Sequence, residues 1–286
     1  MIEVLAPGPY ATVQDLGRPG YAHLGVPRSG AADAAGLRLA NRLVGNPEGS
    51  AGLELTFGGA RLRFLSGAWI AVTGAACPLT VVSGTGAHGM AVPFWLPPGA
   101  ELRVGAPAAG LRTYVAVRGG IDVEPVLGSR STDSLSGLGP EPLRAGTRLP
   151  VGATGALAPI RADHASAGAL PPPVLRVLAG PRDDWFAPGA LAGLCARPYE
   201  VTQDSNRVGV RLRGTALEWA RRGELPSEGV VTGAIQVPPS GQPIVFLADH
   251  PPTGGYPVIG VVLDADLPVA AQARPGDALT FRLVRR

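Results

Sequence analysis

The chain has 286 residues and a formal net charge of +3, with no run of like charges. This length predicts one large domain or two of ordinary size, which can bury a core without disulfides or metals. Because the basic residues neither cluster nor alternate with aromatic ones, nucleic acid is not expected as a partner. All 25 basic residues are arginine. The absence of lysine excludes a P-loop lysine, a Schiff base and an attachment site for biotin.

Glycine and proline make up about a quarter of the residues and stand between short apolar runs, which predicts short strands joined by tight turns. They also interrupt the uncharged stretch 64–100, so we do not expect it to cross a membrane. The opening residues, MIEVLAPGPY, lack the basic segment and long apolar run of a signal peptide. With two widely separated cysteines, Cys77 and Cys195, these features predict a cytoplasmic protein with reduced thiols.

The apolar runs predict a mainly β fold, because they are rich in Val, Leu and Ile and are bounded by Gly or Pro. In chain order, strands are predicted over residues 62–64, 69–73, 79–83, 102–105, 113–118, 174–179, 199–202, 208–212, 235–237, 244–248, 258–263 and 278–284. Helices are predicted over 31–44, 183–194 and 267–273. The first helix has an apolar stripe and is stopped by Gly45 and Asn46-Pro47.

One segment has the composition of a linker. Residues 160–173 read IRADHASAGALPPP, which is small, rich in alanine and closed by three prolines. We therefore predict an N-terminal domain over 1–160, a linker over 161–173 and a C-terminal domain over 174–286.

Several common motifs are rejected. The segment 84–89, GTGAHG, fits GxGxxG, but no helix is predicted after it and no acidic residue lies about 20 positions on. A glycine-rich connection between strands accounts for it better. No GxSxG or HExxH occurs, and the four histidines are isolated in sequence, so no metal site is expected.

Polar side chains gather in glycine- and proline-rich turns. They lie in segments 13–20, 25–30, 126–132, 203–207, 227–229, 234–249 and 252–257. Taken singly, Asp15 and Asp204 are explained as turn caps, and the arginines as solvated or paired groups. Taken together, rigid turns on a β scaffold are the usual place for binding groups, and arginine suits recognition of a carboxylate or phosphate. The hairpin AIQVPPSGQPIVFLAD, residues 234–249, has the most constrained of these turns.

These turns also carry a family resemblance. In chain order, the segments are QDLGRPGYAHLGVPRSGAAD, NRLVGNPEGSAGLE, GGIDVEPVLGSRST, DSNRVGVRL and SEGVVTGAIQVPPSGQPIVFLADHPPTGGYP. They resemble the KipI-antagonist family, also called the allophanate hydrolase subunit 2 family or the C-type subunits of 5-oxoprolinase. The likeness runs over nearly the whole chain, and the GAIQVPPSGQPI segment with its GGYP continuation is highly specific.

The resemblance implies two tandem cyclophilin-like β-barrel domains with a few short helices. It also implies partners, because members work with a KipI-like B-type subunit, and together with an A-type subunit the complex opens 5-oxoproline to glutamate using ATP. The same module forms half of the carboxyltransferase domain of urea carboxylase, where carboxybiotin from another domain delivers CO2 to urea. In that case biotin could reach this lysine-free chain only on a partner.

Both chemistries must hold a planar amide or urea and stabilise negative charge on its oxygen. Under the resemblance, Asp249 and Glu228 are candidate bases, and Arg130 or Arg207 is a candidate for the substrate carboxylate. Gln236 and Asp249 are candidates to hydrogen-bond the amide plane. The other candidate substrate-binding residues are Gln14, Arg18, Ser131, Asp204, Ser240, Thr253 and Tyr256.

Three functions stay open. The favoured one is a component of an ATP-dependent 5-oxoprolinase that is inactive alone. The second is the carboxyltransferase component of a urea carboxylase or allophanate-type system. The third is a regulatory protein that binds a KipI-like kinase inhibitor and performs no chemistry. His250-Pro251 stands where related chains carry a basic residue followed by a polar one, which leaves the exact substrate open.

Overall fold

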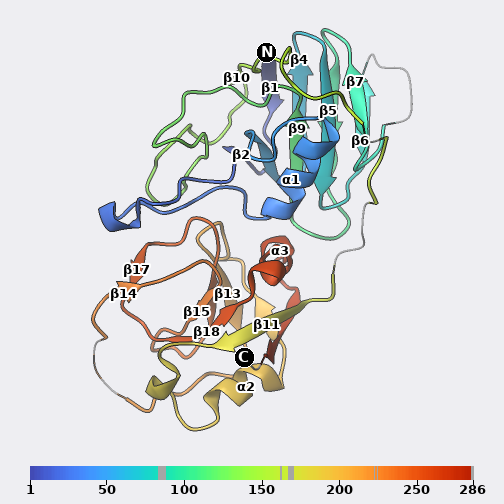
Figure 1. Ribbon diagram of the computed structural model, residues 1–286. Coiled ribbons are helices and arrows are strands. Elements are labelled where there is room, and N and C mark those ends of the chain that lie inside the picture. Colours follow the sequence, from blue (N-terminus) through green and yellow to red (C-terminus); the bar gives the residue numbers. More distant parts are fainter. Residues whose placement is uncertain (83–87, 162, 167–170, 222, 224, 285–286) are drawn as a thin grey trace. The chain divides into compact units, whose positions relative to one another are not determined.

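The structure is a computed structural model that describes residues 1–82, 88–161, 163–166, 171–221, 223 and 225–284 (Figure 1). The chain divides into two compact units. The first comprises Met1–Arg18, Ser29–Asp133 and Gly137–Leu170, and the second comprises Pro19–Arg28, Ser134–Ser136 and Pro171–Arg286. Two short segments that precede the expected linker are therefore part of the second unit. The linker over 161–173 stays a prediction, and residues 162 and 167–170 within it lie outside the described residues.

The first unit consists of two five-stranded antiparallel sheets that share one core. One sheet has the order β10 (Arg148–Leu149), β1 (Ile2–Ala6), β4 (Ala60–Phe64), β8 (Glu101–Val104) and β6 (Leu79–Val82). The other has the order β2 (Tyr10–Gln14), β3 (Gly52–Thr56), β9 (Arg112–Val117), β5 (Ala68–Gly74) and β7 (Pro93–Leu96). Alternating residues such as Val4, Leu62, Leu53 and Val115 are buried in that core, as period-2 strands require.

Helix α1 (Ala34–Leu43) packs on β5 and β9 (Figure 1). It begins after Asp33, whose side chain accepts a hydrogen bond from the backbone N–H of Gly36, and it ends at Val44 before Gly45. The helix predicted over 31–44 is therefore confirmed, with a later start because Asp33 is the cap. A 3-10 turn, η1 (Ala22–Leu24), belongs to the arm 19–28 of the second unit.

The second unit is built on a closed barrel of seven strands. Their order is β11 (Val174–Ala179), β18 (Val258–Val262), β15 (Ala234–Gln236), β16 (Ile244–Phe246), β13 (Gly209–Arg213), β12 (Tyr199–Val201) and β19 (Ala278–Leu283). Closure comes from the parallel pairing of β11 with β19, the one parallel pair among the strand pairs described. The shorter elements are the two-stranded ribbon β14 (Glu228–Gly229) with β17 (Thr253–Gly254), and η2 (Asp183–Trp185), α2 (Ala190–Ala196), η3 (Asp264–Asp266) and α3 (Leu267–Gln272).

The constrained hairpin is formed by β15 and β16, as the sequence predicts, with Ile235 opposite Val245. Its turn is closed by a hydrogen bond from Gly241 N–H to the carbonyl of Pro238, at 2.9 Å. Gly241 has a φ of +72°, and a Cβ on it would lie 3.0 Å from the backbone N and O of Leu217. Glycine at position 241 is thus explained by a left-handed backbone and by close packing against the neighbouring chain segment.

The mainly β prediction is confirmed, and every strand range expected from the sequence overlaps an observed strand. Of the described strands, those that were not predicted are β1, β2, β3, β7, β10, β14 and β17. In β2 and β3, the buried Thr12, Gln14 and Glu54 interrupt the apolar pattern. The helix expected over 183–194 is instead η2 and α2, since Gly189 adopts a φ of 84° between them. The GxGxxG segment falls mostly at 83–87, outside the described residues.

We expect Leu62→Ala to lower the free energy of unfolding by about 2–5 kcal/mol, because Leu62 is fully buried between the two sheets and its removal leaves a cavity. Leu65, three residues on and 41% exposed, is the matched control, and Leu65→Ala should change stability by less than about 0.5 kcal/mol. Urea denaturation followed by circular dichroism measures both variants. Equal losses would contradict the shared core.

Candidate functional site

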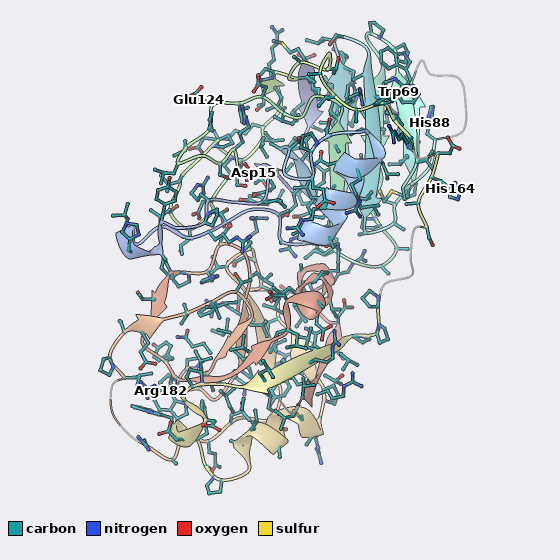
Figure 2. All side chains as sticks on the ribbon, viewed as in Figure 1. Asp15, Trp69, His88, Glu124, His164 and Arg182 are labelled. Atoms are coloured by element: carbon teal, nitrogen blue, oxygen red, sulfur yellow. The ribbon has the colours of Figure 1, made fainter. Side chains whose placement is uncertain are left out.

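In the first unit, a buried carboxylate organises the turn after β2. Asp15 Oδ1 accepts hydrogen bonds from the hydroxyls of Ser129, at 2.6 Å, and Ser131, at 2.5 Å. The same oxygen accepts from Gly17 N–H, and Oδ2 accepts from Arg130 N–H at 2.6 Å. Asp15, labelled in Figure 2, therefore fixes the loop 129–131 to the end of β2. Ser131, which the sequence predicts as a site residue, is thus part of the cluster around Asp15.

Two further predicted site residues, Arg18 and Gln14, hold the same loop. Arg18 is 1% exposed and donates from Nη2 to the carbonyl of Ser131 at 2.5 Å, while its Nη1 lies 3.8 Å from Asp133 Oδ2. Gln14 is fully buried and donates from Nε2 to the carbonyl of Thr132 at 2.9 Å. Both side chains donate hydrogen bonds to backbone carbonyls of this loop, which indicates that they hold the loop in its conformation.

Arg130 is divided between this cluster and the surface. Its backbone N–H binds Asp15, but its side chain donates from Nη2 to Asp122 Oδ1 and from Nε to the carbonyl of Val123, both at 2.7 Å. The Arg130 side chain is 36% exposed and the Asp122 side chain 55% exposed. A surface ion pair of this kind adds little stability.

A second buried network in the first unit was missed from the sequence. Glu54 is 1% exposed, and its Oε2 accepts hydrogen bonds from Tyr114 Oη and Ala32 N–H, both at 2.9 Å. Burial, together with the negative charges of Glu54 and Asp33, raises the pKa of Tyr114 well above its usual value. Arg112 Nε lies 3.5 Å from Glu54 Oε1. A glutamate inside the strand segment GLELT is the signal that could have pointed to this network.

The second unit contains a buried ion pair between two predicted site residues, Arg207 and Asp249. Asp249 is 0% exposed and Arg207 is 3% exposed. Arg207 donates from Nε to Asp249 Oδ2 at 2.9 Å and from Nη2 to Oδ1 at 3.1 Å, which is a bidentate pair. Ser134, which the sequence did not single out, donates to Oδ2 from its hydroxyl at 2.6 Å and from its N–H at 3.0 Å. The structure thus joins two residues predicted as a base and a carboxylate binder.

The pKa of Asp249 is lowered by these neighbours. Burial alone would raise the pKa, but the positive charge of Arg207 and the hydrogen bonds from Arg207 and Ser134 outweigh it. Asp249 is therefore an anion at neutral pH.

The other predicted residues of the second unit have separate environments. Glu228 forms an ion pair with Arg182, labelled in Figure 2, and the hydrogen bond from Arg182 lowers the pKa of Glu228. Gln236 donates from Nε2 to the carbonyl of Tyr256 at 3.2 Å. The remaining four are exposed and lie in turns, bends or the short ribbon: Asp204, Ser240, Thr253 and Tyr256.

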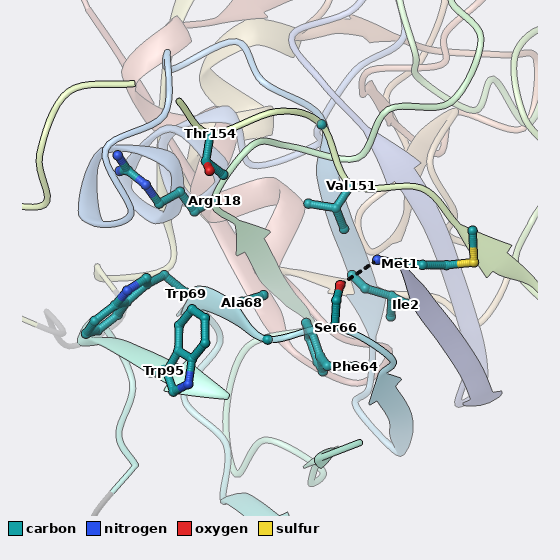
Figure 3. Close-up of a pocket in the computed structure, with 12 residues that line it drawn as sticks. Met1, Ile2, Phe64, Ser66, Ala68, Trp69, Trp95, Arg118, Val151 and Thr154 are labelled. Carbon is teal, nitrogen blue, oxygen red and sulfur yellow. Dashed lines mark hydrogen bonds between the residues drawn. The ribbon is translucent and has the colours of Figure 1, made fainter. Parts of the chain in front are cut away.

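The first unit also has a cavity of about 290 Å³ that the sequence did not indicate (Figure 3). The rings of Trp69 and Trp95 meet edge to face beside it, with centroids 6.0 Å apart. Arg118 also lines the cavity. Its guanidinium donates hydrogen bonds from Nη1 to the carbonyl of Val44 and from Nη2 to the carbonyl of Ala158, so it is engaged by the backbone.

Within the described ranges, no group of three or more His, Cys, Asp or Glu residues is arranged to hold a metal ion. The helices in the same ranges are all too short or too polar to cross a bilayer.

The sequence and fold match one family throughout. The model of the carboxyltransferase domain, subdomain A and B, matches residues 24–283. The chain belongs to this family. It is 36% identical to the C-type subunit of 5-oxoprolinase from Escherichia coli (strain K12) over 288 residues, which cover 98% of this chain and 90% of that protein. It is also 36% identical to urea amidolyase of Lachancea kluyveri over 315 residues, covering 98% of this chain and 17% of that protein.

Among solved structures, the chain is similar to TTHA0988, with a TM-score of 0.88 and 39% identity. The match covers 98% of this chain and 55% of that one. This member of the carboxyltransferase domain family therefore spans nearly all of the E. coli oxoprolinase protein, about half of TTHA0988 and a minor part of urea amidolyase.

We expect Asp249→Asn to lower the free energy of unfolding by about 3–5 kcal/mol, because it removes the negative charge from one side of a buried bidentate ion pair with Arg207. The matched control is Asp122→Asn, which removes the exposed pair with Arg130 and should cost less than about 1 kcal/mol. Denaturant unfolding of both variants at pH 7 provides the comparison. Similar losses in the two would contradict a buried role for Asp249.

The stability difference between wild type and Asp249→Asn should also depend on pH. The pKa of Asp249 is lower in the folded chain than its unfolded value of about 3.9, so the carboxylate adds stability above that pH. This contribution is lost as the pH falls through the folded-state pKa. The difference should be constant above about pH 5 and narrow below about pH 4, as measured by denaturant unfolding. A constant difference throughout would contradict the ion pair.

Proposed function

We propose that this chain is the C-type subunit of an ATP-dependent 5-oxoprolinase that opens 5-oxoproline to glutamate with a KipI-like B-type subunit and an A-type subunit. The observation that carries the proposal is the 36% identity to a C-type subunit of 5-oxoprolinase, which extends over 98% of this chain and 90% of that protein. The alignment leaves almost no part of either chain unmatched. On this proposal the chain is cytoplasmic and inactive without its partners.

Opening an unstrained lactam requires energy and an activated carbonyl. The net reaction adds one water molecule across the ring C–N bond and couples this to hydrolysis of ATP by a second. The chain has no lysine for a P-loop, so we assign ATP to the complex as a whole. The chain would contribute groups that orient the planar amide and the carboxylate of the substrate.

We propose that the buried cluster of Asp249, Arg207 and Ser134 fixes the backbone next to these orienting groups. A carboxylate with a lowered pKa is a weak base, so we propose that Asp249 holds Arg207 and Ser134 in position for the reaction. Glu228 also has a lowered pKa and pairs with Arg182, and we propose the same kind of role for it.

A second candidate is the carboxyltransferase component of a urea carboxylase. The similarity to urea amidolyase supports it, since the identity is also 36%. In that reaction biotin would arrive on a partner, because the chain offers no lysine to attach it. The coverage of 17% of urea amidolyase against 90% of the oxoprolinase protein makes the oxoprolinase the better match in extent.

The proposed function is tested by co-expressing this chain with the proteins encoded beside it and measuring glutamate release from 5-oxoproline and ATP. We expect glutamate only when this chain and ATP are both present. An assembled complex that forms no glutamate would overturn the oxoprolinase. ATP turnover that depends on urea and a biotin carrier would then support carboxyl transfer, and a complex inactive in both assays would support a regulatory role.

Ser134→Ala tests the cluster around Asp249 in the same complex. The variant removes the 2.6 Å hydroxyl bond to Asp249 but keeps the backbone bond, so the fold should persist. We expect kcat to fall by about tenfold, as for loss of a hydrogen bond to a charged group, and Ser134→Thr to recover part of it. Ser66→Ala, which removes an exposed hydroxyl of the first unit, is the control. Unchanged kcat in Ser134→Ala would remove the cluster from the mechanism.

A further inference from the structure

The second unit has a cavity of about 290 Å³ that none of the predicted site residues lines. Its polar lining residues are Arg28, Thr232, His250 and Asp264, and its other six lining residues are alanine, valine or proline. The volume is at the lower end of the range for ligand sites, and mostly apolar walls with a few polar groups are typical of them. The cavity therefore suits a compact ligand with a small apolar body.

His250 lines this cavity, and its ring is held in place by neighbouring groups. It is 6% exposed, and its ring stacks on Phe246 at 5.8 Å between centroids. Its Nδ1 lies 2.7 Å from the carbonyl oxygen of Pro251. A carbonyl can only accept, so Nδ1 carries the proton and Nε2 of the neutral ring is left as an acceptor. In the part of the chain that the structure describes, Nε2 has no hydrogen-bond partner.

The protonation state of His250 supports an acceptor role. Burial lowers the pKa of the ring, against weaker opposing effects of the Pro251 carbonyl and the negative charge of Asp249. The imidazole is therefore neutral at pH 7. A neutral ring with Nδ1 already protonated can accept a hydrogen bond from an amide N–H.

Arg28 supplies a positive charge among the residues that line the same cavity. Its residue is exposed, and within the described residues its side chain forms neither an ion pair nor a hydrogen bond. Asp264 also lines the cavity, and in the described part of the chain it forms no ion pair with Arg28. The guanidinium is therefore available to a carboxylate of a ligand, which it can bind in bidentate fashion.

We propose that this cavity binds a compact cyclic amide bearing a carboxylate, with the carboxylate on Arg28, the amide N–H on His250 Nε2 and the ring against the apolar wall. Resting on the proposed function, this ligand is 5-oxoproline, which has all three features. Urea has the N–H groups but neither the carboxylate nor an apolar ring. The cavity is thus suited to a lactam acid, and it adjoins the buried ion pair through the peptide bond between Asp249 and His250.

The test is a titration of the full-length chain, alone and in the co-expressed complex, with two ligands that differ only by the carboxylate. These are 5-oxoproline and 2-pyrrolidinone, and binding is followed by ligand-observed NMR. We expect Arg28→Gln to weaken 5-oxoproline binding by about tenfold or more and to leave 2-pyrrolidinone unchanged. The matched control is Arg148→Gln, at an exposed arginine of the first unit, which should change neither.

Two substitutions distinguish the roles of the two ring nitrogens of His250. In His250→Asn the side-chain amide can replace Nδ1 as donor to Pro251, but no acceptor remains at the Nε2 position. In His250→Gln an amide oxygen can take the place of Nε2. We expect His250→Asn to weaken both ligands by several-fold and His250→Gln to recover part of the loss. Equal binding by wild type and all these variants, or no binding of 5-oxoproline to wild type, overturns the proposal.

The outcomes also distinguish the cavity from the proposed function. Glutamate formation with a KM that is unchanged in Arg28→Gln and His250→Asn would overturn the cavity and leave the oxoprolinase in place. If the complex assembles and binds 5-oxoproline in a way that depends on Arg28, but forms no glutamate, the cavity would be supported and the oxoprolinase overturned. A KM raised in both variants, with kcat and assembly retained, would support both.

Discussion

The cost of removing a carboxylate from water is the constraint on which the loops of this protein depend. Asp249, Glu54 and Asp15 are each less than about a tenth exposed. A charge in such a position is tolerated only when donors surround it. Each of the three carboxylates therefore accepts hydrogen bonds from segments far apart in the sequence, and these bonds hold the segments together.

The hydrogen-bond donors around these carboxylates differ between the two units. Asp15 and Glu54 are bound largely by hydroxyls and backbone N–H groups, and they tie loop 129–131 and the start of α1 to the first unit's sheet. Asp249 is bound by a bidentate guanidinium and a serine, and lies next to the histidine that lines a cavity. The first arrangement serves architecture, whereas the second places charged and polar groups beside space that a ligand can enter.

The proposed chemistry fits this arrangement because a lactam acid needs two kinds of contact. Its carboxylate needs an available cation, which the buried Arg207 cannot easily supply while it is bonded to Asp249. Arg28 comes from the arm 19–28, which precedes most of the chain but belongs to the second unit. The site thus combines an arginine from near the beginning of the sequence with a histidine from near its end.

The sequence by itself determined the strand-rich fold, the family and the hairpin over 234–249, because period-2 apolar runs and Gly-Pro turns are local signals. It also brought forward Asp249, Arg207, Arg18 and Gln14 as polar residues in rigid turns. It did not show that Arg207 pairs with Asp249, nor that Ser134 joins them. Only the tertiary structure decided those partnerships, because contacts between residues 42 or 115 positions apart depend on how the strands pair. The buried Glu54 and the cavity at His250 were hidden for the same reason: burial and enclosure are properties of packing, which a local pattern does not contain.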